Sequence, residues 1–74
     1  MGKLSGFKYK EIVKKLTFVG FEFFREAKGS HEIWFNKDRN KYTTVVKRHG
    51  DIPEGTLKNI IKQADIEVED FLEI

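Results

Sequence analysis

A block of strand-forming residues, divided into three pieces by short polar turns, constrains the fold more than any other feature. Residues 21–48 are rich in aromatic and β-branched side chains, and turns interrupt them at Ala27–Ser30 and Lys37–Asn40. Because these connections are too short for crossovers, neighbouring strands must pair antiparallel. The three strands are predicted at about Phe21–Glu26, Ser30–Asn36 and Lys41–Arg48.

Amphipathic segments flank this block. Before it, apolar residues fall on one helical face, which predicts a helix at about Phe7–Val19. We expect Ser5 to be its N-cap and Gly20 to be the left-handed residue that ends it. Two further helices, a long one and a short C-terminal one, are indicated by Leu57, Ile60, Ile61 and Ala64, and by Val68, Phe71 and Leu72.

The predicted architecture is an α+β fold with the order helix, three antiparallel strands, helix and short final helix. Each long helix has an apolar face to bury, so we expect both on one face of the sheet. His31 alternates in phase with Ile33 and Phe35, and we expect this apolar face to pack under the helices, with His31 at the rim of the core. Trp34 belongs either to the core or, in phase with Glu32, to an exposed platform for stacking bases.

Length and composition limit the number of domains and the classes of protein to which the chain can belong. The chain has 74 residues, which predicts one domain over residues 1–74, and no apolar run approaches the ~18 residues of a membrane span. It has no cysteine, which excludes disulfides and thiolate metal sites. The first five residues lack the apolar core of a signal peptide, so we expect a cytoplasmic protein.

The formal net charge of +2 is unevenly distributed along the chain. Residues 1–15 carry five lysines and one acid, residues 25–62 carry nine Lys or Arg and five acids, and residues 65–74 carry five acids and no base. A basic body is typical of proteins with a polyanionic partner. Charge alone, however, favours the ordinary interpretation of a solvated surface of mixed charge.

Histidine is the side chain best suited to chemistry here, and the two histidines are His31 and His49. A metal shared between them and a carboxylate such as Asp51 has no supporting ligand spacing, so we expect no metal and no cofactor. RNA cleavage needs neither, because the 2′-hydroxyl of the substrate can attack the adjacent phosphorus while a histidine transfers the proton. The ordinary alternative for His31 is a strand-end histidine bonded to backbone.

Cations suited to holding phosphate lie near His31 in the predicted sheet. They are Arg25, Lys28, Lys47 and Arg48.

Four segments of the chain form a pattern: Leu16–Phe21, Gly29–Trp34, His49–Leu57, and Ile60–Ile66 with Glu69–Leu72. Together they extend over about residues 5–72. In this order and at this spacing they resemble the HicA toxin family.

The resemblance implies the fold of a double-stranded-RNA-binding domain. It implies a toxin that cleaves messenger RNA without the ribosome or a metal, and a HicB-type antitoxin that blocks its site. It also implies that activity depends on His31, the histidine of the Gly-Ser-His motif. The role of His49, as a second proton-transfer group or a structural residue, stays open. We infer RNA-binding roles for Lys28, Gly29, Ser30, Lys47, Arg48 and His49.

The sequence departs from the family pattern in places. The family often has proline before the third-strand histidine, where this chain has Lys47 and Arg48, and it usually has glycine at the position of Asp65. We therefore expect Asp65 to adopt a left-handed backbone conformation, which Asp tolerates better than most residues. Two other functions stay open: a non-catalytic RNA-binding module of the same fold, and a protein-interaction domain with a cationic face.

Overall fold

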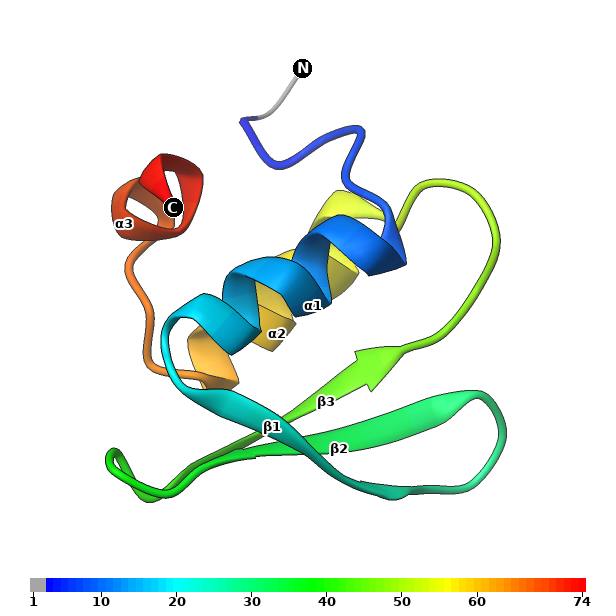
Figure 1. The fold of residues 1–74 in the computed structure, drawn as a ribbon. Coiled ribbons are helices and arrows are strands. Elements are labelled where there is room, and N and C mark those ends of the chain that lie inside the picture. The colour runs from blue at the N-terminus through cyan, green and yellow to red at the C-terminus, as the bar shows by residue number, and fades with distance from the viewer. Residues whose placement is uncertain (1–2) are drawn as a thin grey trace.

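The computed structural model describes residues 3–74, and its element order is the one predicted. The elements are α1 (Tyr9–Phe18), β1 (Phe21–Glu26), β2 (His31–Asn36), β3 (Lys41–Val46), α2 (Glu54–Gln63) and α3 (Val68–Glu73). The strands form one antiparallel sheet with β2 in the centre. Figure 1 shows α1 and α2 on the same side of the sheet, with α3 lying beside them. Within residues 3–74, no helix is long and apolar enough to span a bilayer.

The prediction for α1 is wrong at the start of the helix and confirmed at its end. Ser5 is not the N-cap, because residues 3–6 form turns and the helix begins at Tyr9. The backbone N–H of Lys8 instead donates to the Glu11 carboxylate at 2.8 Å, so an acidic side chain satisfies the first free donor. The predicted end is confirmed, since Gly20 has a φ of 104°. A side chain there would also meet the Asn36 amide at 3.2 Å.

One hydrophobic core lies between the helices and the sheet. Trp34 is part of it, with 9% of its surface exposed, so the core interpretation is confirmed and the exposed stacking platform was wrong. The other buried apolar residues of the core include Ile12 and Leu16 from α1, Phe21 and Val45 from the sheet, Leu57, Ile60 and Ile61 from α2, and Phe71 from α3.

The two faces of the sheet are the reverse of those predicted. The helices cover the face that carries Glu32, Trp34 and Asn36, all buried, whereas Ile33 and Phe35 lie on the open face and are only partly buried. On that open face Phe35 packs against Tyr42 and Phe24, with ring centroids 4.4 and 6.1 Å apart. His31, in phase with Ile33, therefore lies on the open face of the sheet and not at the rim of the core.

Hydrogen bonds explain how polar residues occupy the covered face. The Glu32 carboxylate accepts from the Tyr9 hydroxyl at 2.6 Å and from the Trp34 indole at 3.1 Å. The Asn36 amide donates to the Val19 carbonyl at 2.9 Å. Because their polar atoms are satisfied, these side chains are buried without the cost of an unpaired group.

The turn after α2 confirms the expectation for Asp65. Its φ is 61°, in the left-handed region. A hydrogen bond closes this turn, since the Ile66 N–H donates to the Ile61 carbonyl at 3.0 Å. Arg39 donates to the Asp65 carbonyl at 2.9 Å, so the turn is also tied to the β2–β3 connection.

Candidate functional site

The turn between β1 and β2 holds the imidazole of His31. The Ala27 N–H donates to the His31 carbonyl at 2.8 Å, which closes the turn. Gly29 has a φ of 73°, and the Lys28 carbonyl oxygen lies 3.1 Å from His31 Nδ1. A carbonyl oxygen only accepts hydrogen bonds, so Nδ1 carries the hydrogen in this contact. In the neutral ring the lone pair is then on Nε2.

His31 is exposed, at the first position of β2 and opposite Val46 of β3. A backbone hydrogen bond holds the end of β3 beside the turn, because the Lys47 N–H donates to the Ser30 carbonyl at 2.8 Å. A small hollow of about 210 Å³ results. It is lined by Glu26, Gly29, Ser30, His31, Glu32 and Lys47.

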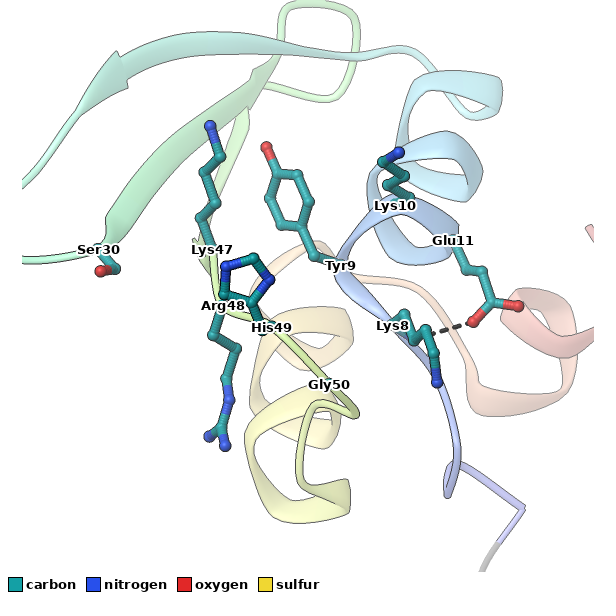
Figure 2. Close-up of a pocket in the computed structure, with 9 residues that line it drawn as sticks. All are labelled: Lys8, Tyr9, Lys10, Glu11, Ser30, Lys47, Arg48, His49 and Gly50. Atoms are coloured by element: carbon teal, nitrogen blue, oxygen red, sulfur yellow. Dashed lines mark hydrogen bonds between the residues drawn. The ribbon is translucent and has the colours of Figure 1, made fainter.

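A larger groove of about 930 Å³ adjoins this hollow and shares Ser30 and Lys47 with it. One wall is the start of α1, and the other is the chain that leaves β3 toward α2 (Figure 2). It is lined by Lys8, Tyr9, Lys10, Glu11, Ser30, Lys47, Arg48, His49 and Gly50.

The structure distributes the predicted site residues over these two hollows. Gly29, Ser30 and Lys47 adjoin His31, whereas Arg48 and His49 line the groove. Lys28 lines neither hollow and contributes its backbone carbonyl to His31. β3 ends at Val46, two residues earlier than predicted, so Lys47, Arg48 and His49 belong to the loop.

Contacts between the two walls close one end of the groove. The Lys8 ammonium donates to Asp51 at 2.6 Å, and the Ile52 N–H donates to the Phe7 carbonyl at 2.8 Å. The hydrogen bond and charge of Asp51 raise the pKa of Lys8. Asp51, the candidate third ligand of a shared metal, is thus paired with a lysine. In the described part of the chain, no three His, Cys, Asp or Glu side chains form a group that could hold a metal ion.

Tyr9 and Glu32 are site residues that the sequence did not reveal. Tyr9 lines the groove, and its hydroxyl donates to Glu32, which lines the hollow of His31. Burial, then the hydrogen bond and charge of Glu32, raise the pKa of Tyr9 to about 12. The phenol therefore remains a donor at neutral pH. The one signal in the sequence was Glu32 itself, an acid in phase with Trp34 on a strand of aromatic residues.

The family of the chain follows from comparison with known proteins. The sequence model of a family described as "HicA toxin of bacterial toxin-antitoxin" matches residues 9–66, which is more than half of the chain. The chain belongs to the HicA toxin family. No curated protein matches it significantly. As a HicA family member it is the toxin of a toxin–antitoxin pair and has a cognate antitoxin as its partner.

We expect Gly29→Ala to destabilise this HicA toxin by about 1–2 kcal/mol, because a side chain at a φ of 73° is strained. The added Cβ would also lie 3.7 Å from His31 Nδ1, in contact with the ring. Urea unfolding measures the loss, and Gly29→Asn is the control, since Asn tolerates this backbone region better. Equal stability of the Ala variant and the wild type would show that the turn does not require glycine.

The raised pKa of Tyr9 predicts how the stability of the fold changes at alkaline pH. The folded HicA toxin holds this phenolic proton more tightly than the unfolded chain, whose tyrosines titrate near pH 10. The stabilisation is therefore complete below about pH 10 and is lost as the pH rises to about 12. Tyrosinate absorbance should show a step near pH 12 that Tyr9→Phe removes and Tyr42→Phe retains. Loss of that step in Tyr42→Phe would contradict the assignment.

Proposed function

We propose that this HicA toxin is a metal-independent endoribonuclease that cleaves messenger RNA in the cytoplasm, with His31 as its acid–base residue. The observation that carries the proposal is the bond between His31 Nδ1 and the Lys28 carbonyl on an exposed strand end. It orients the ring and leaves Nε2, which carries the lone pair of the neutral ring, without a hydrogen-bond partner among the described residues. A general base needs such a held and accessible lone pair.

In the proposed reaction His31 Nε2 takes the proton of a ribose 2′-hydroxyl. The 2′-oxygen forms a bond to the adjacent phosphorus, the bond from phosphorus to the 5′-oxygen breaks, and water protonates the leaving oxygen. The products are a 2′,3′-cyclic phosphate and a free 5′-hydroxyl. Negative charge develops on the phosphate oxygens, and a nearby ammonium stabilises it.

Lys47 is the cation best placed for that charge. It lines both the hollow of His31 and the groove. The ion pairs among residues 3–74 are Lys3–Glu69 and Lys8–Asp51, so Lys47 forms no ion pair within the described chain. A HicB-type antitoxin would block the enzyme by covering this cationic surface, and complementary charge predicts acidic residues at the contact.

The test is cleavage of a single-stranded RNA by the purified protein in EDTA. We expect fragments that end in a cyclic phosphate, and no cleavage at a position where the nucleotide 5′ to the cut is replaced by its 2′-deoxy form. Cleavage of the 2′-deoxy position would contradict attack by the 2′-hydroxyl. Binding of RNA without any cleavage would instead show a non-catalytic RNA-binding module.

A further inference from the structure

The groove beside His31 contains two aromatic rings that the proposed reaction does not use. Tyr9 is the first residue of α1, and His49 lies in the loop that leaves β3, so the rings come from the two walls of the groove. In Figure 2 both rings lie between the end of β3 and α1. The groove volume, about 930 Å³, falls within the ~300–1,000 Å³ typical of ligand clefts.

Tyr9 is held in a fixed orientation. Its hydroxyl donates to Glu32 at 2.6 Å, and Glu32 is itself fixed by the Trp34 indole at 3.1 Å. The ring is partly buried against the core but still lines the groove. A ring fixed in advance loses little conformational entropy when a flat ligand stacks on it.

His49 is free to meet such a ligand. It is exposed, and among residues 3–74 no hydrogen bond is formed by its imidazole. The lining of the groove is cationic, with the Lys47 ammonium over the Tyr9 ring, 6.0 Å from its centre, and with Lys10 and Arg48 among the other residues. The acid of the lining, Glu11, already accepts from the Lys8 backbone. An aromatic slot with a cationic rim therefore favours a planar group attached to an anion.

We propose that the groove binds one nucleobase of single-stranded RNA between Tyr9 and His49, beside the link that His31 cleaves. The proposal rests on the endoribonuclease function above and assigns His49 to substrate positioning. Stacking of unpaired bases on aromatic side chains is the usual way in which proteins hold single-stranded RNA. Because the groove and the hollow share Ser30 and Lys47, a base in the slot places its phosphate near His31.

Binding is measured in the His31→Ala protein, in which the proposed cleavage is absent, and this protein is the parent of the variants below. Tyr9→Leu and His49→Ala remove a ring, and each should weaken affinity for a short single-stranded RNA about tenfold. Tyr9→Phe and His49→Phe keep a ring and should stay within about threefold. Tyr9→Phe also loses the bond to Glu32, so it separates stacking from any structural effect of losing that bond.

The same RNA with one base removed at each position in turn identifies the bound base. At one position, base removal should weaken binding of the parent about tenfold and have no further effect on Tyr9→Leu. The proposed base-binding slot would be contradicted if the ring-deleting variants and the parent had equal affinity. It would also be contradicted if base removal weakened binding of the parent and of Tyr9→Leu alike at every position.

Cleavage by the same variants with His31 restored separates the two proposals. Cleavage by the wild type together with unchanged binding of the ring-deleting variants would keep the endoribonuclease and reject the slot. Base-dependent binding without wild-type cleavage would keep the slot and reject the endoribonuclease. Absence of RNA binding by the His31→Ala protein at low salt, together with absence of cleavage by the wild type, would reject both and favour a protein ligand for the groove.

Discussion

His31→Ala is expected to lower the rate of RNA cleavage by about 10²–10⁴-fold, the usual contribution of a positioned acid–base group. The side chain is exposed, and its one hydrogen bond among the described residues is to the Lys28 carbonyl. Its removal should therefore leave the thermal unfolding midpoint nearly unchanged. The measurement is the single-turnover cleavage rate at saturating protein, so that weaker binding does not count as slower chemistry.

Two controls test the reason for this loss. In His31→Asn the side-chain amide can still donate to the Lys28 carbonyl but has no basic nitrogen at neutral pH, so cleavage should be as slow as in His31→Ala. Lys28→Ala keeps the backbone carbonyl and removes only a charge, so cleavage should fall by less than about tenfold. Cleavage at the wild-type rate by His31→Ala would show that the imidazole is an ordinary strand-end residue.

The order of the elements was predictable because each has one clear periodicity. The apolar stripe of residues 57–64 and the glycine at position 20 define α2 and the end of α1 without reference to the rest of the molecule. The orientation of β2 was not predictable, because both of its faces carry large apolar side chains. Trp34 and Phe35 point to opposite faces, and only partners from other elements decide which one is covered.

The candidate site shows the same division between local and distant information. The turn that holds His31 is contiguous in sequence, so the residues Ala27–Ser30 were sufficient to predict it, whereas the choice of His31 came from the resemblance to the HicA family. Tyr9 is separated from Glu32 by 23 positions, and the two meet only because α1 packs on the sheet beside the first residues of β2. Similarly, the ion pair between Lys8 and Asp51, 43 positions apart, closes the groove. No pattern within a short window contains these contacts.

The groove and the open face of the sheet have different chemistry. On the groove side, Lys10, Lys47 and Arg48 have no ion-pair partner among residues 3–74, which suits a polyanion. On the open face, Phe24 and Tyr42 are about half exposed and pack edge to face, with centroids 5.6 Å apart. Tyr42 pairs with Phe35 near the end of β2, whereas His31 pairs with Val46 at the start of β2, so Tyr42 lies at the opposite end of the sheet from the imidazole. The cationic groove, and not the aromatic pair, is therefore the surface that adjoins the hollow of His31.

Phe71→Ala should lower the free energy of unfolding by about 3–5 kcal/mol, a larger loss than that expected for Gly29→Ala. Phe71 is fully buried and packs edge to face on Phe7, with ring centroids 5.4 Å apart. The Lys15 ammonium lies 5.2 Å from the Phe71 ring and donates to its backbone carbonyl at 3.1 Å. Small domains have about 5–15 kcal/mol in total, so urea unfolding should show a much lower midpoint.

Phe18→Ala is the matched control, because it removes the same side chain from a position that is 78% exposed and should change stability by less than about 0.5 kcal/mol. The comparison bears on α3, which lies beyond the residues 9–66 that match the HicA family. A large loss in Phe71→Ala alone would show that this helix is part of the cooperative fold. Equal small losses would show that α3 unfolds separately, and the groove and His31 would then not depend on this helix.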